Sequence, residues 1–485
     1  MTRSSLLLAL AGTTLLAGCN LAPTYVRPAG AVPATLPQGG IYPPAATDAP
    51  DVSAIGWRDF FTEDRLRQVI ARGLENNRDL RVAAANVLQA RERYRIQRAE
   101  QVPSTGLSGS ATYTNNAFGA GGAGGAAGGV GTGVGAGVGT TSSNLEFYSL
   151  TAGFSAFELD LFGRVRNLSR AALQQYFATE EARRATRISL IAEIATAWLT
   201  LASDQDQLRL SRDTLRAFEQ TRTLTQAQFR VGVASELEAR QADTNYQAAR
   251  NDIAVAETRI ARDRNALDLL VGAPVPGELL PAGLGEGQAT LTALPMGLSS
   301  AVLLRRPDVL QAEHRLIAEN ANIGAARAAL FPNISLTASL GTISSALTGL
   351  FGGGSFTYSA APGISFALFD GGAARSNVRL SEATRQGAVA TYERTIQVAF
   401  REVADALAQR GTIGEQVAAQ SARAESALVA SRLSDARYRV GVTSFITALD
   451  AQRTAYAAQQ QLVTTRLTRA NNLVELYRSL GGGLN

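Results

Sequence analysis

The sequence predicts a membrane protein of the α+β class, in which pairs of β-strands alternate with very long helical hairpins. Three observations support this fold class. Runs of about ten residues alternate apolar with small polar side chains, as membrane strands do. Helical patterns of roughly 60 residues keep a seven-residue apolar period, which is typical of coiled coils. The same order of elements occurs in both halves of the 485-residue chain, which indicates an internal duplication.

Two strand patterns lie in each half, within residues 107–114, 148–155, 335–340 and 356–366. The alternative is a half-buried hairpin of a soluble protein. Four strands in lipid would leave unpaired edges, and each free backbone group there costs several kcal/mol. Small closed barrels need about eight strands, and eight leave no channel. We therefore expect three copies to form a trimeric, twelve-stranded barrel with four strands per chain.

Long helical patterns begin at Arg164 and Ala374, directly after the second strand of each pair. The outgoing helix of the first half repeats leucine every seven residues, at Leu201, Leu208 and Leu215. The last helix repeats its apolar positions in the same way, at Leu449, Tyr456, Val463, Ala470 and Tyr477. Sustained heptads predict coiled-coil packing, here as a long helical tunnel that continues the barrel.

Each long hairpin is expected to turn at a heptapeptide that the chain contains twice. The copies read Phe229-Arg230-Val231-Gly232-Val233-Ala234-Ser235 and Tyr438-Arg439-Val440-Gly441-Val442-Thr443-Ser444, and they start 438 − 229 = 209 residues apart. Glycine suits the left-handed residue that ends a helix, and a hydroxyl caps the next one. Ser235 and Glu238 also form the pattern of a capping box. Taken alone, such a turn fits a hairpin in any helical bundle.

The spacing of other residues extends the duplication. Asp79 and Asp308 are 229 residues apart, and so are Pro103 and Pro332, so the first half carries 229 − 209 = 20 extra residues in a Gly-rich loop. The predicted organisation is a signal peptide (1–18), a lipid-anchored extended segment (19–60), a first repeat with its tip near 229–235 (61–271), a connecting segment (272–300), a second repeat with its tip near 438–444 (301–480) and a tail (481–485). Segments 19–60 and 272–300 are expected to form a mixed equatorial belt with the tail.

The N-terminus predicts export and lipid attachment. Arg3 precedes an apolar run from Leu6 to Ala17, which is too short to span a bilayer and ends in Leu16-Ala17-Gly18-Cys19. Cys19 stands where a lipoprotein signal is cleaved and the thiol receives lipid, which would anchor the chain to a membrane. The alternative is an ordinary signal peptide with a chance cysteine.

Composition argues against several classes of function. One Cys and one His leave no disulfide framework and no Cys/His metal cluster. His314 lies in a charged helical pattern, so a surface or packed helix position is expected for it. The net charge of +5 is spread thinly, without basic runs, which does not favour nucleic-acid binding. We expect no enzyme activity, no metal and no cofactor other than the lipid on Cys19.

Several motifs resemble the TolC-like outer membrane efflux factors, most nearly the lipoprotein branch typified by OprM and NodT. They are Leu304-Arg305-Arg306-Pro307-Asp308-Val309, Ala325-Ala326-Arg327-Ala328-Ala329-Leu330-Phe331-Pro332, Leu368-Phe369-Asp370-Gly371-Gly372 and Leu449-Asp450-Ala451-Gln452-Arg453, besides the lipobox and Pro23-x-Tyr25-x-Arg27-Pro28. The resemblance implies a homotrimer in the outer membrane with its helices in the periplasm. It implies the exit duct of a tripartite pump, with a periplasmic adaptor protein and an inner-membrane RND transporter.

The resemblance also implies two sets of site residues. The closing residues of the periplasmic gate fall on Tyr438, Ile446, Asp450 and Arg453. The adaptor would dock on the tips, at Val231, Gly232, Val233, Ser235, Val440, Gly441, Val442, Thr443 and Ser444. The Asp450 and Arg453 motif follows only the second tip, so we expect the gate there. Asp450 also suits the first turn of a helix, where the helix dipole favours an acid.

Two other functions remain as alternatives. One is the outer membrane component of another export system, such as type I secretion. The other is a trimeric surface adhesin with a coiled-coil stalk, which would not need strand pairs between its helices. The sequence leaves the cargo open, whether drugs or other small toxic molecules.

Overall fold

The computed structural model describes residues 20–43, 55–116, 143–285, 289–290 and 299–482. Cys19 and the Gly-rich loop therefore lie outside the described residues. The chain divides into two compact units, and each takes residues from both repeats. The strand unit comprises Met1–Tyr25, Arg91–Gln174 and Ile317–Gln386. The hairpin unit comprises Val26–Ala90, Gln175–Leu316 and Gly387–Asn485.

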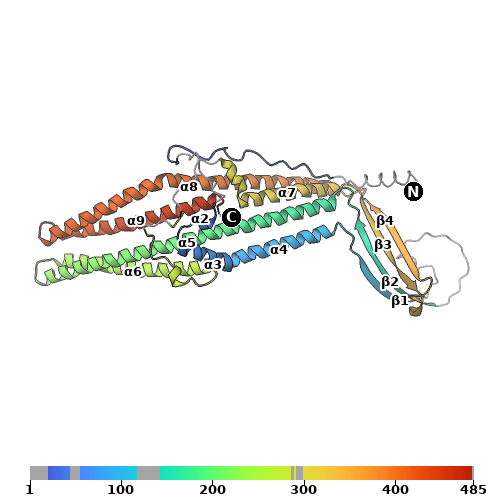
Figure 1. Cartoon of the computed structure of the whole chain (residues 1–485), viewed down its shortest axis with the longest axis horizontal. Coiled ribbons are helices and arrows are strands. Elements are labelled where there is room, and N and C mark those ends of the chain that lie inside the picture. Colours follow the sequence, from blue (N-terminus) through green and yellow to red (C-terminus); the bar gives the residue numbers. More distant parts are fainter. Residues whose placement is uncertain (1–19, 44–54, 117–142, 286–288, 291–298, 483–485) are drawn as a thin grey trace. The chain divides into compact units, whose positions relative to one another are not determined.

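The strand unit contains one antiparallel sheet in the order β1-β2-β3-β4 (Figure 1). Its strands are β1 (Gly106–Asn116), β2 (Ser143–Glu158), β3 (Asn333–Ser344) and β4 (Phe356–Ser365). One face carries paired hydroxyls, with Ser108 and Thr151 at 2.9 Å and Ser110 and Ser149 at 2.8 Å. The other face exposes large side chains such as Leu107, Tyr358 and Ile364. Such a sheet suits a wall between water and lipid.

The residue pairing of the first strand hairpin is repeated in the second. Leu107 pairs with Ala152 in the first, and Leu336 pairs with Pro362 in the second. The shifts are 336 − 107 = 229 and 362 − 152 = 210. The same shifts carry Gly109–Leu150 onto Ala338–Ala360 and Ala111–Tyr148 onto Leu340–Tyr358. The duplication thus extends to the pairing of individual residues.

Residues of β2 and their duplicates in β4 are 210 positions apart, whereas the two turn heptapeptides are 209 apart. A bulge in β2 explains this difference of one residue. The register of β2 against β3 shifts between Phe154 and Phe157, and Ala156 within it has φ of 51°. The Ala156 amide donates to Thr337 Oγ1 at 3.0 Å instead of joining the ladder. One extra residue in β2 therefore restores the 209-residue spacing beyond it.

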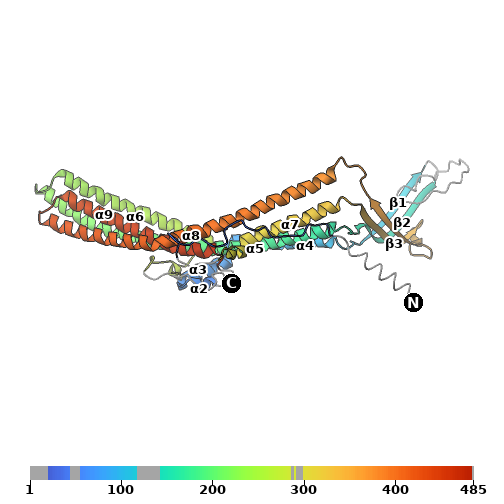
Figure 2. The same cartoon turned by 90° about the horizontal axis from the view of Figure 1, so that it is seen from above.

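Two long helical hairpins follow the strands. Their helices are α5 (Arg164–Arg230), α6 (Glu236–Val271), α8 (Ala373–Arg439) and α9 (Phe445–Ser479). The outgoing helices α5 and α8 have 67 residues each, slightly more than expected. In length and composition α5 could cross a membrane, but 56% of its apolar stretch is buried. The turns of the two hairpins lie side by side in both ribbon views (Figures 1 and 2).

The other helices of the described residues are shorter than these. They are α2 (Trp57–Phe60), α3 (Asp64–Asn76), α4 (Arg78–Ala99), α7 (Pro307–Ala328) and three 3-10 turns, η2 (Gly277–Leu279), η3 (Ser300–Arg305) and η4 (Leu347–Gly349). The helix α2 lies within the segment 19–60 that was expected to be extended. It forms because Trp57, Phe60 and Phe61 are buried, with Phe60 stacked on Tyr477 at 4.0 Å.

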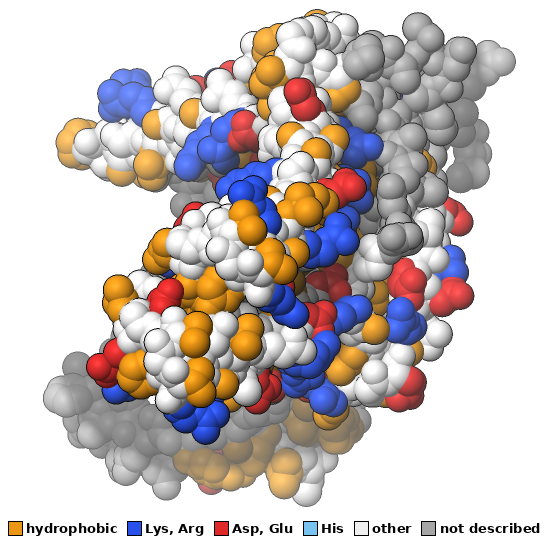
Figure 3. All heavy atoms as spheres, turned by 90° about the vertical axis from the view of Figure 1, so that its left-hand side faces the viewer, with side chains coloured by type: hydrophobic (Ala, Val, Ile, Leu, Met, Phe, Trp, Pro, Cys, Tyr) orange, Lys and Arg blue, Asp and Glu red, His pale blue; other side chains and the backbone are white. Residues whose placement is uncertain are grey.

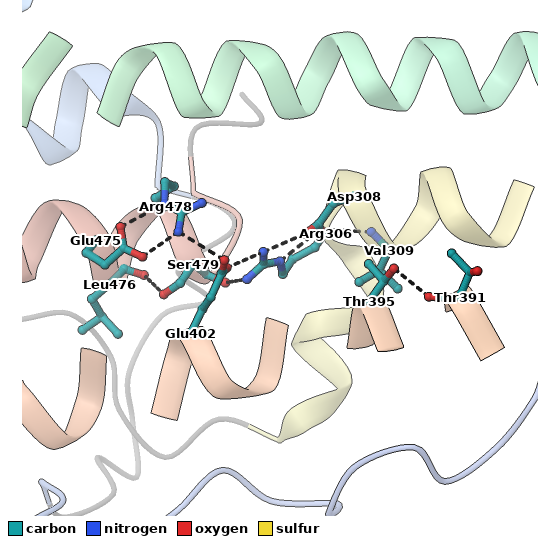
Figure 4. Close-up of polar contacts among 10 residues, drawn as sticks. All are labelled: Arg306, Asp308, Val309, Thr391, Thr395, Glu402, Glu475, Leu476, Arg478 and Ser479. Atoms are coloured by element: carbon teal, nitrogen blue, oxygen red, sulfur yellow. Dashed lines mark hydrogen bonds and ion pairs between the residues drawn. The ribbon is translucent and has the colours of Figure 1, made fainter. Parts of the chain in front are cut away.

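A buried ion-pair cluster fixes the C-terminal end of α9 in the hairpin unit (Figure 4). Arg306 is only 6% exposed, and its guanidinium binds Asp308 at 2.7 Å, Glu402 of α8 at 2.8 Å and the Ser479 carbonyl at 2.6 Å. Arg478 adds a second contact to Glu402 at 3.4 Å. Burial lowers the pKa of Arg306, but the bonds to Asp308 and Glu402 outweigh it and leave the pKa raised. Arg306 thus joins three segments through one planar group.

Candidate functional site

The first tip has the predicted turn chemistry. Gly232 takes a left-handed φ of 79°, and the Val233 amide donates to the Gln228 carbonyl at 2.8 Å, which closes the end of α5. Ser235 caps α6 through a complete capping box. Its hydroxyl accepts from the Glu238 amide, and the Glu238 carboxylate accepts from the Ser235 amide at 2.8 Å.

The second tip repeats this geometry with one difference. Gly441 has a φ of 74°, and the Val442 amide donates to the Arg437 carbonyl at 2.9 Å. Ser444 caps α9 by accepting from the Thr447 amide at 3.4 Å, so the cap has no carboxylate. The Thr443 hydroxyl is buried and has no partner among the described residues.

Both turns expose apolar side chains to solvent. Val231 and Val233 of the first turn are 74% and 75% exposed, and Val440 and Val442 of the second are 73% and 62% exposed. Figure 3 looks onto this end of the hairpin unit, where apolar side chains lie among arginines. Four exposed valines at adjacent turns form a patch that suits contact with another protein.

The second hairpin is held against the first by a small core behind the turns. Ala242 of α6 packs with Phe445 and Leu449 of α9, and Tyr438 lies against this cluster. The Tyr438 hydroxyl donates to Gln228 Oε1 at 2.9 Å, and burial raises the pKa of Tyr438. Tyr438 is therefore a contact between the hairpins.

The other three predicted gate residues lie together on the exposed side of α9. Ile446, Asp450 and Arg453 are spaced i, i+4 and i+7, so they share one face of the helix. Ile446 is 54% exposed, and Asp450 and Arg453 are also exposed. Within the described part of one chain, neither Asp450 nor Arg453 forms an ion pair. The structure thus brings three of the four residues onto one stripe and places Tyr438 behind it.

Further along α9, Tyr456 makes hydrogen bonds as well as the coiled-coil packing that its heptad position predicts. Its hydroxyl lies 2.9 Å from Ser211 Oγ of α5 and donates to Asp252 Oδ2 of α6 at 3.0 Å. Burial raises the pKa of Tyr456 to about 12. The sequence contains one indication of these bonds: a tyrosine at a core position of a heptad needs a polar partner for its hydroxyl.

Two acidic side chains and the single histidine make structural contacts. Glu158 binds Arg164, and Asp370 accepts from the Gly372 and Ala374 amides, so both lie at junctions between a strand and a long helix. His314 of α7 packs against Phe177 of α5, with ring centroids 5.5 Å apart, and burial lowers the pKa of His314. Across the described residues, no three His, Cys, Asp or Glu side chains gather to hold a metal ion.

The family model described as "Outer membrane efflux protein" matches residues 69–273 and 298–482, which is most of the chain. The chain belongs to the outer membrane efflux protein family. It is 43% identical to the "Toluene efflux pump outer membrane protein TtgC" of Pseudomonas putida, over 100% of this chain and 96% of that protein. It is 37% identical to the "Cation efflux system protein CusC" of Escherichia coli, over 96% of this chain and 97% of that protein.

A solved structure has the same fold. The open state of the Neisseria gonorrhoeae MtrE outer membrane channel aligns with a TM-score of 0.83 at 34% identity, covering 96% of this chain and 99% of that one. The predicted fold class and location are confirmed: this efflux protein is an outer membrane channel with barrel strands and long helical hairpins. The function predicted from the sequence, efflux through an outer membrane channel, is confirmed at this level.

Proposed function

We propose that this efflux protein works as a homotrimer whose three sheets close one twelve-stranded barrel. The observation that carries this is the sheet itself. Among the described residues, β1 and β4 have no strand partner on their outer edges. Open edges are not tolerated in lipid, because each free N–H and C=O group costs several kcal/mol. A second copy offers the complementary edge, and three copies leave room for a channel.

The internal duplication supplies the register of this closure. The contact of β2 with β3 joins the two hairpins within a chain, so its duplicate is the contact of β4 with β1 of the next copy. Phe154 pairs with Ala338 in β2–β3. The shifts give 154 + 210 = 364 and 338 − 229 = 109, so Ile364 should face Gly109 of the next copy. The pair Ala152–Leu340 becomes Pro362–Ala111 in the same way.

Cysteine cross-linking tests both the trimer and its register. The double variant Ile364→Cys with Gly109→Cys should form covalent dimers and trimers under oxidation on a denaturing gel. Cys19 is the only native cysteine. A link within one chain is excluded, because three strand spacings of about 4.8 Å separate β1 from β4, about 14 Å, whereas a disulfide needs about 4.4–6.8 Å between Cα atoms.

The matched control is Ile364→Cys with Ala111→Cys, which is two residues out of register. Diagonal neighbours are too far apart for efficient cross-linking. Preferential cross-linking of this control would show that the register is wrong. A trimer that neither pair cross-links would overturn closure through β4 and β1. A monomer by light scattering would overturn the trimer.

We further propose that the channel is the outer component of a tripartite efflux pump. Its tips would dock a periplasmic adaptor protein that connects it to an inner-membrane RND transporter. The support is the patch of exposed valines on the paired turns, because an apolar patch of this kind suits contact with the apolar face of another helical hairpin. Lipid on Cys19 would add a second anchor in the membrane. The similar proteins are named for toluene in one case and cations in another, so the duct is expected to leave the choice of small molecule to the transporter.

Gating is proposed at the start of α9. In a trimer, Ile446, Asp450 and Arg453 would each form a ring of three around the axis, where an apolar or charged ring controls passage. Asp450→Arg and Arg453→Glu are therefore expected to make the channel leakier, as larger or more frequent single-channel currents in planar bilayers without the adaptor. The control is Asp405→Arg on α8, a carboxylate that is 75% exposed and makes only a long contact to Arg401, so its reversal should leave the currents unchanged. Unchanged conductance in both gate variants contradicts this assignment.

A further inference from the structure

One hydroxyl of the second hairpin contacts both helices of the first. Tyr456 of α9 binds Ser211 of α5 at 2.9 Å and Asp252 of α6 at 3.0 Å. The bond to Asp252 is charge-assisted, and such bonds are about twice as strong as neutral ones. Tyr456 is only partly exposed, and its phenol is protonated at physiological pH, so it donates to the Asp252 carboxylate. We call these three side chains the Tyr456 node.

The other polar contacts of α9 with the first hairpin are either longer or use only the backbone of α9. Gln452 donates to Thr221 Oγ1 at 3.4 Å, and its own Oε1 is buried without a partner among the described residues. Gln460 contributes only its backbone carbonyl, which accepts from Gln207 at 3.0 Å. The node is thus the one place in the described structure where an α9 side chain binds α5 and α6 together.

Nearer the turn, Phe445 and Leu449 pack α9 on Ala242 of the first hairpin, but beside the node only small side chains are buried, so the hydroxyl is the specific contact there. The buried residues on either side are Ala455 and Ala458, which carry one methyl group each. Small side chains fit a neighbouring helix in more than one rotation, whereas a hydrogen-bonded phenol fits in one. Because α9 is continuous from Phe445 to Ser479, a rotation at Tyr456 also turns the stripe of Ile446, Asp450 and Arg453.

We propose that Tyr456 is a positioning residue of the tip gate. Its bonds to Ser211 and Asp252 hold α9 in the rotation of this structure, and that rotation closes the channel. This rests on the proposed gate at Ile446, Asp450 and Arg453. Opening then requires that the node break or that the first hairpin move together with α9. Tyr456 itself lies ten residues beyond Ile446 along α9 and does not need to line the gate.

The test is single-channel recording of Tyr456→Phe in the assembled trimer. Loss of the hydroxyl should raise the open probability about tenfold, which corresponds to about 1.4 kcal/mol. Ser211→Ala and Asp252→Ala should each raise it, and neither should add to Tyr456→Phe, because contacts of one network are not additive. Open probability of a trimer that has already formed is a measure that a purely structural role leaves unchanged.

Tyr246→Phe is the matched control. Tyr246 lies on α6 with Arg222 over its ring at 4.6 Å, and no hydrogen bond of its hydroxyl occurs among the described residues. It should gate normally. If Tyr456→Phe gates normally while Asp450→Arg leaks, the node is not the positioning element and the gate stands. If the Tyr456 and Asp252 variants add fully, the node does not act as a unit. If neither Tyr456→Phe nor the charge reversals change the currents, the gate assignment itself is wrong.

Discussion

Replacing Arg306 with methionine is expected to lower the free energy of unfolding by about 3 kcal/mol, because it leaves two partly buried carboxylates without their buried cation. The Arg306 side chain is 6% exposed, and Asp308, Glu402 and the Ser479 carbonyl all depend on it. Glu402 keeps a longer contact to Arg478, so the loss falls at the lower end of the range for broken buried pairs. Guanidinium unfolding of the detergent-solubilised protein, followed by its helical circular dichroism, measures this.

Two further variants define the cause. Arg401→Met removes a neighbouring arginine that is 71% exposed and lies 4.0 Å from Asp405, so its loss should cost less than about 0.5 kcal/mol. Arg306→Lys keeps the charge but cannot bind Asp308 and Glu402 with a planar fork, and its cost should be intermediate. Equal stability of Arg306→Met and Arg401→Met would show that the cluster in Figure 4 does not hold the end of α9.

The sequence predicted the fold well because its main signals are local. Alternation of apolar and polar residues specifies a strand with two different faces, and the heptads specify packed helices. The turn at Gly232 and the capping box at Ser235 and Glu238 involve residues within a few positions of each other, so their chemistry is visible in the sequence. Both were found as predicted.

Contacts between distant segments were not predictable in this way. Arg306 belongs to a motif that resembles the family, but the motif does not show its partners. Glu402 and Ser479 are 96 and 173 residues away. Tyr456 was read as one apolar position of a heptad, and its hydroxyl partners Ser211 and Asp252 lie on helices of the other repeat. The bulge at Ala156 changes the spacing of the duplication by a single residue. The small side chains of the strand make a shift of one position hard to recognise in the sequence. The gate residues remain a prediction by resemblance.

The largest effect on assembly is expected from a methyl group at either of two duplicated glycines. A Cβ at Gly153 would lie 2.3 Å from the Ala338 carbonyl oxygen of β3, so Gly153→Ala should disrupt the contact of β2 with β3 within the chain. Its duplicate is 153 + 210 = 363, which is Gly363 of β4. A Cβ at Gly363 meets only the Ser335 hydroxyl at 3.2 Å, and that side chain can rotate.

Gly363→Ala should therefore fold as a single chain and still fail to close the barrel. In the proposed register its new methyl group meets the backbone of Gly109 and Ser110 of the next copy, as Gly153 would meet Ala338 and Ser339. The yield of heat-stable trimer in the outer membrane should fall at least tenfold for both variants, an expected cost of more than about 1.4 kcal/mol per assembly.

Gly109→Ala separates this steric argument from a general loss of glycine. Its duplicate at 109 + 229 = 338 is already alanine, in the contact that β2 and β3 make within the chain. A methyl group at Gly109 meets only Leu150 Cδ1 at 3.6 Å and the Ser149 carbonyl at 3.8 Å, so this variant should assemble normally. Normal assembly of Gly363→Ala would mean that β4 meets the next copy in another register. Failure of Gly109→Ala would mean that the edge of β1 does not repeat the edge of β3, since the same methyl group is accommodated there.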